Sequence, residues 1–359
     1  MKTPKIILTG GGTAGHVSLN QALIPFFMDR GYELHYIGSR DGIERELITE
    51  AFPEVTYHPI QSGKLRRYFS IKNFTDPIKV AGGLLQSLRI IKKLKPEVIF
   101  SKGGFVSVPV VMAGKMAGIP VVIHESDVTP GLANKLAMPF ANHIFSVFEE
   151  TLNYLPSEKS TCTGAIIRPE LFSGHKERGL AMSGFDGKKP VLLITGGSQG
   201  SAAINGAVRS ILPNLLETFD IIHLCGKGKL EHSLDSVDGY KQLEYVTTEL
   251  PDFLASADFV LSRAGSNSIF EFLALKKPML LIPLSAQQSR GDQLLNANLF
   301  KRLGFAEVLT EEELSDDLLF QSITILQKRA DEIIRKMEEA SEAKTPDEMV
   351  NLILDYGRR

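Results

Sequence analysis

The sequence predicts an α/β protein with two doubly wound, Rossmann-like domains, each a parallel sheet covered by helices on both faces. Short apolar runs alternate with helical segments along the chain, which is typical of βαβ units. The pattern begins with KIILTGGGTAG at residue 5 and restarts with PVLLITGGSQGS at residue 190. The length of 359 residues exceeds one ordinary domain and suits two.

Each apolar run is expected to form a buried parallel strand that ends in a Gly- or Pro-marked loop. In the first half the runs are KIILTG, ELHYIG, EVIFSKGG, PVVIHES and HIFSVF. In the second half they are PVLLITGG, DIIHLCGKG, ADFVLSRAGS and PMLLIPLS. Ligands of doubly wound folds bind at the carboxyl ends of the strands, so we expect the ligand in a cleft between the two domains.

The predicted domains are residues 1–165 and 166–344. The last segment, 345–359, begins with TPDE, in which Thr345 is a helix cap and Glu348 completes a capping box. An apolar face follows, and we expect this helix to pack back on the first domain.

Composition excludes several classes of protein. Apolar residues make up 43% and charged residues 23% of the chain, and the net charge of −2 gives no general attraction to nucleic acid. Cys162 and Cys225 are far apart, which argues against a disulfide framework and against a cysteine metal site and suits a reducing cytosol. The start lacks the apolar core of a signal peptide, and no apolar run reaches the roughly 18 residues of a spanning helix.

The first Gly-rich turn, with Gly10, Gly12 and Gly15, matches G-x-G-x-x-G between a strand and a helix. Such a turn lets backbone amides approach a phosphate, although it can also serve only to pack helix on strand. NAD binding would require an acidic residue at the end of the second strand, where Gly38 and Ser39 stand instead. A dinucleotide oxidoreductase is therefore disfavoured.

Three further loops carry polar groups that suit a nucleotide sugar. TGGSQGS at 195–201 is a second phosphate-type turn, and the helix after SRAGS carries Glu271, which is placed to bind a ribose diol or to serve as a solvated helix residue. GDQLLNAN at 291–298 suits sugar hydroxyls or is a hydrophilic helix start. No D-x-D motif occurs, so we expect no metal and no other cofactor, with helix starts and basic side chains stabilising a leaving diphosphate.

Seven motifs in order resemble the bacterial N-acetylglucosaminyltransferases that form lipid II in peptidoglycan synthesis, the undecaprenyldiphospho-muramoylpentapeptide β-N-acetylglucosaminyltransferases. They are TGGGTAGH, SKGGFVSVP, IHESDVTPGLANK, TGAIIRPE, GGSQGS, SRAGSNSIFEF and GDQLLNAN. The resemblance covers nearly the whole chain and implies the glycosyltransferase B fold. It implies inverting transfer of N-acetylglucosamine from UDP-N-acetylglucosamine to undecaprenyl-diphosphate-muramoyl pentapeptide (lipid I), at the cytoplasmic face of the cell membrane.

The same resemblance assigns residues to both substrates. The implied donor residues are Arg168, Ser198, Gln199, Val246, Glu271 and Gln293. The implied acceptor residues are Gly12, Thr13, Ala14, Gly15, Gly103, Gly104 and Glu125. The chain departs from the family pattern at Ala14, where glycine is usual, at Ser126-Asp127 in place of Gln-Asn, and at Asp292 in place of the first of two glutamines.

His16 and Asp127 are the candidate general bases for the transfer. A histidine with a pKa near 6.5 is suited to take the acceptor's proton, and the start of a helix favours its neutral form. Binding of a phosphate or hydroxyl group, or a packing role, is the alternative for His16. Asp127 competes with it for the base role.

Residues 64–95 combine a net charge of +8 with an apolar helical stripe, whose members are Ile78, Ala81, Leu85, Leu88 and Ile91. An ordinary core-facing helix with a solvated basic side explains part of this pattern. Because basic residues around apolar ones attract anionic lipid, we also expect peripheral attachment to an anionic membrane surface. One rival function is a UDP-N-acetylglucosamine 2-epimerase on the same fold, which does not require this surface. The other is a nucleotide-sugar-binding membrane protein without turnover.

Overall fold

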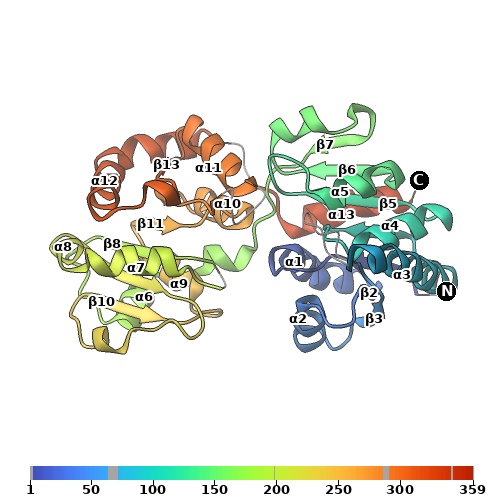
Figure 1. Ribbon diagram of the computed structural model, residues 1–359, viewed down its shortest axis with the longest axis horizontal. Coiled ribbons are helices and arrows are strands. Elements are labelled where there is room, and N and C mark those ends of the chain that lie inside the picture. The colour runs from blue at the N-terminus through green and yellow to red at the C-terminus, as the bar shows by residue number, and fades with distance from the viewer. Residues whose placement is uncertain (1–2, 64–71, 198, 286–290, 341–342, 359) are drawn as a thin grey trace. The chain divides into compact units, whose positions relative to one another are not determined.

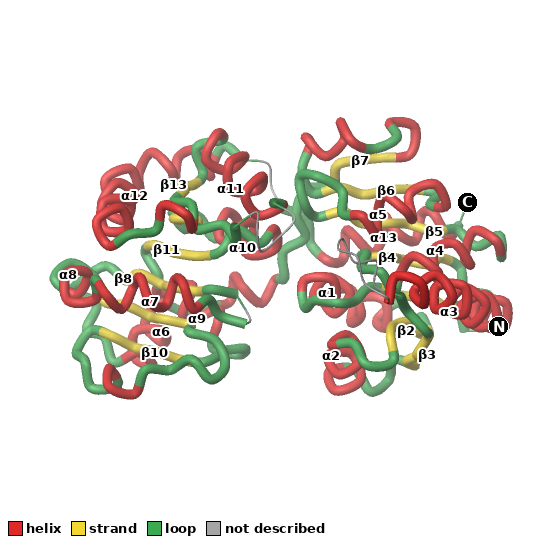
Figure 2. The backbone as a smooth tube through the Cα atoms, viewed as in Figure 1, coloured by secondary structure: helices red, strands yellow, loops and turns green. Residues whose placement is uncertain are grey.

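The computed structural model describes residues 3–63, 72–197, 199–285, 291–340 and 343–358, with the backbone alone for 72–78. The chain forms two compact units. Unit 1 comprises Met1–Ile166 and Lys344–Arg359, and unit 2 comprises Ile167–Ala343. Figures 1 and 2 show the strands and helices of each unit.

Unit 1 contains a parallel sheet whose described strands lie in the order β3-β2-β1-β4-β5-β6-β7. The strands are β1 (Lys5–Thr9), β2 (Glu33–Ser39), β3 (Thr56–Ile60), β4 (Val98–Ser101), β5 (Val121–Glu125), β6 (His143–Ser146) and β7 (Ser160–Cys162). The central strands β4 and β5 are buried along their whole length, as expected when helices cover both faces. The strand order reverses between β1 and β4, where doubly wound folds bind ligands.

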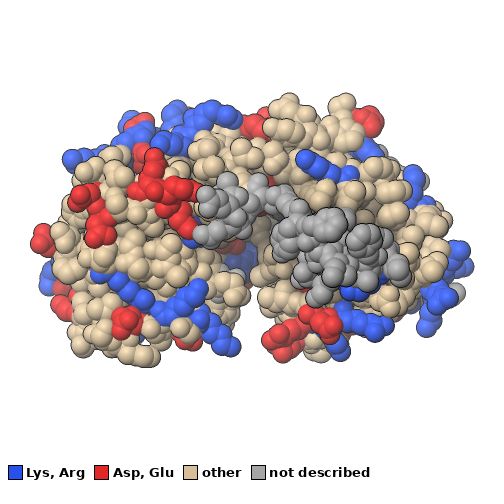
Figure 3. All heavy atoms as spheres, in the orientation of Figure 1, with Lys and Arg blue, Asp and Glu red and all other residues tan. Residues whose placement is uncertain are grey.

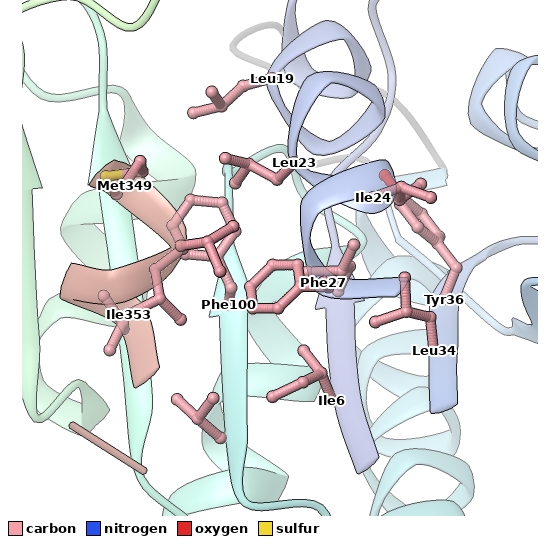
Figure 4. Packing of buried hydrophobic residues seen from close by; sticks show 14 of the residues in the cluster. Ile6, Leu19, Leu23, Ile24, Phe27, Leu34, Tyr36, Phe100, Met349 and Ile353 are labelled. Atoms are coloured by element: carbon pink, nitrogen blue, oxygen red, sulfur yellow. The ribbon is translucent and has the colours of Figure 1, made fainter. Parts of the chain in front are cut away.

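Helices pack on both faces of this sheet. They are α1 (Gly15–Asp29), α2 (Ile43–Ala51), α3 (Lys72–Leu94), α4 (Ser107–Met116), α5 (Leu132–Ala137) and α13 (Pro346–Gly357). On one face, Phe27 of α1 and Ile353 of α13 share an apolar cluster with Phe100 of β4 (Figure 4). On the other face, Ile91 of α3 and Val110 of α4 belong to a second cluster.

The helix start predicted at Thr345 is confirmed. Thr345 Oγ1 accepts from the Glu348 amide at 3.2 Å, and the Glu348 carboxylate accepts from the Thr345 amide at 2.7 Å. This capping box satisfies two amides that would otherwise lack a partner. The buried Met349 and Ile353 then anchor α13 in the α1 cluster of unit 1.

Unit 2 repeats the topology, with its described strands in the order β10-β9-β8-β11-β12-β13. The strands are β8 (Val191–Thr195), β9 (Asp220–Leu224), β10 (Tyr240–Leu243), β11 (Phe259–Ser262), β12 (Met279–Leu281) and β13 (Ala306–Val308). The helices are α6 (Lys176–Ser183), α7 (Ala202–Ser210), α8 (Leu212–Leu216), α9 (Leu250–Ser256), α10 (Ser266–Ala274), α11 (Asp292–Arg302) and α12 (Asp316–Glu338). The predicted fold class, two doubly wound parallel sheets, is therefore confirmed.

Candidate functional site

The acceptor residues predicted in unit 1, together with Asp127, lie in or directly beside three loops that follow neighbouring strands. Residues 10–14 follow β1, residues 102–106 follow β4, and residues 126–131 follow β5. Because β1 pairs with β4 and β4 with β5, all in parallel, the carboxyl ends of these strands share one edge of the sheet. The sheet order thus brings together three segments that are far apart in the sequence.

The first Gly-rich turn presents backbone amides at the start of α1. In the described part of the chain, the amides of Thr13, Ala14 and Gly15 have no hydrogen-bond partner. The Gly12 amide instead donates to the buried Glu44 carboxylate at 3.1 Å. An anion on this turn would therefore meet three amides and the positive end of the α1 dipole, but not the Gly12 amide.

The second Gly-rich turn, after β4, packs directly on the first. The Gly11 amide donates to the Gly103 carbonyl oxygen at 3.2 Å. Gly103 and Gly104 have φ angles of +105° and +85°, which strongly favour glycine. A Cβ atom on Gly104 would overlap the Gly11 carbonyl oxygen, so the close approach of the two turns depends on the missing side chain.

The ring of His16 is oriented by the first turn. Its Nδ1 atom lies 3.0 Å from the Gly11 carbonyl oxygen and 3.0 Å from Thr13 Oγ1. Because a carbonyl oxygen only accepts hydrogen bonds, Nδ1 carries the proton in this contact. The neutral ring then has its lone pair on Nε2, and that nitrogen is the one able to take a proton.

Glu125 organises the loop that carries Asp127. Its carboxylate is 4% exposed. It accepts hydrogen bonds, at 2.8 to 3.0 Å, from the amides of Ser126, Asp127 and Gly131 and from Asn134 Nδ2. All of these donors lie in the loop or in α5, so the carboxylate fixes the shape of the loop from within. Contact of Glu125 with a substrate, and the base role of Asp127, stay predictions.

A buried basic pair, Lys102 and His124, lies beside these loops, and its lysine was missed in the sequence. Lys102 is 2% exposed, and its Nζ lies 3.0 Å from His124 Nδ1. Burial lowers the pKa of Lys102 to about 8, although the charges of Glu125 and Asp127 oppose this. Burial and the Lys102 charge also lower the pKa of His124 well below its usual range, so His124 is neutral. The sequence signal was weak because a lysine after a strand is usually exposed.

In unit 2, the Gly-rich turn after β8 leads into α7. Ser201 caps this helix, and its Oγ accepts from the Ile204 amide at 3.3 Å. Gly197 and Gly200 both have positive φ angles, which give the turn its shape. Gln199 is exposed on the turn, and Ser198, the other predicted diphosphate residue here, lies outside the described residues.

Two basic side chains that the sequence did not single out hold this turn. Arg263, after β11, donates from Nη2 to Ser201 Oγ at 2.7 Å and forms an ion pair with Glu311. Lys229 donates from Nζ to the Gln199 carbonyl oxygen at 2.7 Å. Each of these cations donates to an oxygen atom of the turn. Both therefore place positive charge beside a predicted diphosphate site.

The structure brings together Arg168 and Glu271, which are far apart in the sequence. Arg168 Nη2 donates to Glu271 Oε1 at 3.1 Å. Burial raises the pKa of Glu271, and the Arg168 charge opposes that rise. Because α10 begins at Ser266, Glu271 lies in its second turn. Glu271 therefore lies beyond the first turn, in which the helix dipole acts most strongly on a carboxylate, and its role in binding the ribose stays a prediction.

Val246 lies in the loop after β10, and Gln293 lies at the start of α11, which follows β12. In the part of the chain that the structure describes, the backbone N–H and C=O of Val246 make no hydrogen bond, which leaves both for a nucleotide base. Gln293, in the first turn of α11, accepts from the Leu284 amide through Oε1 at 3.0 Å. This contact directs the Gln293 side chain toward the loop after β12.

Among the described residues, no three His, Cys, Asp or Glu side chains are grouped as a metal ion would require. This arrangement says nothing of an ion held by a substrate. The expectation of a reaction without metal or other cofactor stays a prediction.

Two family models match the chain. The glycosyltransferase family 28 N-terminal domain matches residues 6–146, and the glycosyltransferase family 28 C-terminal domain matches residues 191–352. These ranges fall on the sheets of unit 1 and unit 2 respectively.

Curated relatives resemble the chain over nearly its full length. The UDP-N-acetylglucosamine--N-acetylmuramyl-(pentapeptide) pyrophosphoryl-undecaprenol N-acetylglucosamine transferase of Oceanobacillus iheyensis is 53% identical over 349 residues, which is 97% of each chain. The protein of the same name from Geobacillus kaustophilus is 54% identical over 354 residues, which is 99% of each chain.

Solved structures share the fold at much lower identity. Acinetobacter baumannii MurG superposes with a TM-score of 0.79 at 22% identity, covering 98% of this chain and 99% of that chain. A UDP-N-acetylglucosamine 2-epimerase superposes with a TM-score of 0.66 at 13% identity, covering 100% of this chain and 98% of that chain. The fold alone therefore does not separate a transferase from an epimerase.

Proposed function

The chain belongs to glycosyltransferase family 28, and from this premise we propose that it transfers N-acetylglucosamine from UDP-N-acetylglucosamine to lipid I and so forms lipid II for peptidoglycan synthesis. The observation that carries this conclusion is the identity of 53% and 54%, over almost the entire chain, to transferases named for that reaction. The epimerase alternative has only a likeness of fold at 13% identity and is less supported.

Unit 2 is the proposed donor domain. The backbone of Val246 would bind the uracil, Glu271 the ribose hydroxyls, and the turn at 196–200 the diphosphate. Arg168 supports this assignment because it lies 3.1 Å from Glu271 and is 45% exposed, so it brings a positive charge to the same place. As UDP departs, a fixed cation and oriented amides would stabilise the charge that develops on it.

Unit 1 is the proposed acceptor domain. The acceptor's diphosphate would bind the amides of Thr13, Ala14 and Gly15 at the start of α1. The acceptor hydroxyl oxygen attacks the anomeric carbon of the donor sugar, and the bond from that carbon to the UDP oxygen breaks. His16 Nε2 takes the hydroxyl proton, since Nδ1 already donates to the Gly11 carbonyl oxygen. A single displacement of this kind inverts the anomeric configuration.

The test is transfer of labelled N-acetylglucosamine to a short-chain lipid I analogue in the presence of EDTA. We expect product from the wild type, and a loss in kcat of about a hundredfold or more in His16→Ala, the size typical of a general base. His232→Ala, at an exposed histidine of unit 2, is the matched control. Absence of product from the wild type, with UDP binding intact, would contradict the transferase function.

The outcome for His16 also separates its two roles. A normal kcat with a raised acceptor KM would make His16 a binding residue and leave Asp127 as the candidate base. A wild type that is active only without EDTA would contradict the expectation of metal-free transfer.

The exposed face of α3 is the proposed membrane-binding surface. Leu85 is 58% exposed, and Arg89, Lys92 and Lys93 are exposed beside it. Figure 3 shows Lys and Arg side chains gathered at the edge of the molecule where Figure 1 places α3. Among the described residues, no helix is long and apolar enough to span a membrane. We expect peripheral binding, in which anionic lipid attracts the basic groups and Leu85 enters the interface.

Vesicle binding tests this surface. The double charge reversal Arg89→Glu/Lys92→Glu should weaken binding to anionic vesicles at low salt by roughly thirtyfold, since each basic residue contributes about 1 kcal/mol near such a surface. Lys188→Glu/Lys189→Glu in unit 2 makes the same change in net charge and should bind nearly as the wild type does. Equal losses in both double variants would show that only net charge matters. Arg66 and Arg67, which belong to the same basic segment, lie outside the described residues.

A further inference from the structure

Glu44 is a buried carboxylate directly behind the first Gly-rich turn. It lies in the first turn of α2, and it is 1% exposed. Its Oε2 accepts from the Gly12 amide at 3.1 Å, and its Oε1 accepts from the Ser39 amide at 3.0 Å and from the Ser39 hydroxyl. One side chain thus connects the turn after β1 to the end of β2.

The surrounding backbone is shaped to admit this carboxylate. A Cβ atom on Gly11 or on Gly42 would overlap the Glu44 carboxyl group, whereas a Cβ atom on Gly38 would overlap the Tyr57 hydroxyl group and only closely approach Glu44 Cγ. These glycines come from the turn after β1, from β2 and from the loop before α2. An ordinary surface glutamate needs no such space, so the site is built around Glu44.

The hydrogen bond between the Gly12 amide and Glu44 also affects the orientation of the His16 ring. Glu44 fixes the Gly12 amide, and the peptide that bears this amide also bears the Gly11 carbonyl oxygen. That oxygen accepts from His16 Nδ1 at 3.0 Å. Because a peptide unit is planar, the direction of its N–H sets the direction of its C=O. The orientation of one peptide therefore links the Glu44 carboxylate to the histidine.

We infer that Glu44 is a positioning residue that holds the Gly11–Gly12 peptide in one orientation. In this orientation His16 keeps its proton on Nδ1, and the amides of residues 13–15 stay available to the acceptor's diphosphate. This inference rests on the proposed function for its kinetic consequence, but the geometry of His16 is a property of the protein alone. It also gives a physical reason why the turn does not suit a dinucleotide, since the acid beside it is buried and bonded to backbone rather than open to a ribose.

Glu44→Gln tests the inference through kinetics. Gly12 and Ser39 donate to different oxygens of Glu44, and in glutamine one of these oxygens is replaced by an NH2 group, so one of the two backbone amides then faces a donor. We expect kcat/KM for the acceptor to fall about tenfold to a hundredfold, as for loss of a hydrogen bond to a buried charged group, while KM for the donor stays within twofold. Glu46→Gln removes the same charge from an exposed position of α2 and should behave as the wild type does.

The tautomer of His16 provides a readout that does not depend on activity. Nitrogen NMR of protein labelled at histidine, with the His16 signals identified by their loss in His16→Gln, should show a protonated Nδ1 in the wild type and a mixture of tautomers in Glu44→Gln. Gly42→Ala, which crowds the carboxylate without touching the turn, should shift the tautomer in the same direction. An unchanged tautomer and unchanged acceptor kinetics in both variants would overturn the inference. Absence of transfer in the wild type would overturn the proposed function, and the NMR result would still decide the role of Glu44.

Discussion

Glu271, the proposed ribose-binding residue, occupies a buried position at a cost to its own solvation. Burial raises the pKa of its carboxyl group, so the fold disfavours the charged form, and Arg168 compensates only in part. Glu271→Gln should therefore leave the thermal midpoint of unfolding at neutral pH no lower than that of the wild type. The same variant should raise the donor KM roughly tenfold, because a carboxylate accepts from both ribose hydroxyls.

Steady-state kinetics and thermal unfolding of Glu271→Gln check this prediction together. Glu217→Gln, at an exposed position of unit 2, is the control. A parallel loss of stability and of donor binding would contradict it, because Glu271 would then be a structural residue.

Burial of Lys102 predicts that the free energy of unfolding depends on pH. The pKa of Lys102 falls from 10.5 in the unfolded chain to about 8 in the fold, mainly through burial. Below pH 8 both states are protonated and the fold carries the full penalty of about 3 kcal/mol. Between pH 8 and 10.5 the folded state loses its proton while the unfolded state keeps it, so the contribution of Lys102 to stability rises with pH.

Lys102→Met isolates this contribution, since methionine has a similar shape and no charge. The free energy of unfolding of the wild type minus that of Lys102→Met should increase between pH 7 and pH 10 by up to about 3 kcal/mol. Urea unfolding followed by circular dichroism measures it, with Lys115→Met on the exposed side of α4 as the control. A constant difference across that range would show that Lys102 does not titrate there.

The sequence indicated residues with a local signature and missed residues whose role depends on burial. His16 and the glycines of the first turn stand in a motif, so they were identified in the sequence. Glu44 and Lys102 stand in no motif, and each resembles an exposed charged residue until the sheet order shows it to be buried. Burial of a charge depends on the packing of several elements, which one segment of sequence does not contain.

At the scale of elements, the start of α13 is a local feature with a measurable stability. Thr345→Ala removes the side chain that accepts from the Glu348 amide and should lower the free energy of unfolding of unit 1 by about 1 kcal/mol. Thr345→Ser keeps the capping hydroxyl group and should retain most of the free energy of unfolding that Thr345→Ala loses. Thermal unfolding measures the effect against Thr324→Ala, at a half-buried position inside α12. Equal effects of both alanine substitutions would contradict a capping role.

Helix α3 shows the limit of sequence periodicity. The stripe of apolar residues suggested one apolar face, and Ile91 is indeed fully buried. Leu85 and Ala81, which were placed on the same face, are exposed instead. The buried side of the helix includes Ser87, whose small side chain fits the packing although it is polar. Periodicity locates the helix, but the shape of the neighbouring elements selects the face that packs.

At the scale of the whole molecule, the fold was predictable because the same pattern occurs twice. The strand orders β3-β2-β1-β4-β5-β6 and β10-β9-β8-β11-β12-β13 are equivalent, and in each unit a Gly-rich turn follows the first strand of the sequence. Repetition of topology also explains how one fold serves two substrates. Each unit offers helix amides at its reversal point, and different loops around that point set what is bound.

The proposed division of the two substrates between the units predicts a hydrogen-exchange pattern that is confined to one unit. Saturating UDP, at about a hundred times its Kd, should stabilise the bound form by about 2.7 kcal/mol and slow amide exchange in residues 196–201 and 244–249, but not in residues 10–16. Uridine, which lacks the diphosphate, should protect residues 244–249 alone, because we assign the turn at 196–201 to phosphate binding. Exchange measured by mass spectrometry distinguishes these peptides. Protection of residues 10–16 by UDP would place the nucleotide diphosphate on the α1 turn and reverse the assignment of donor and acceptor to the two units.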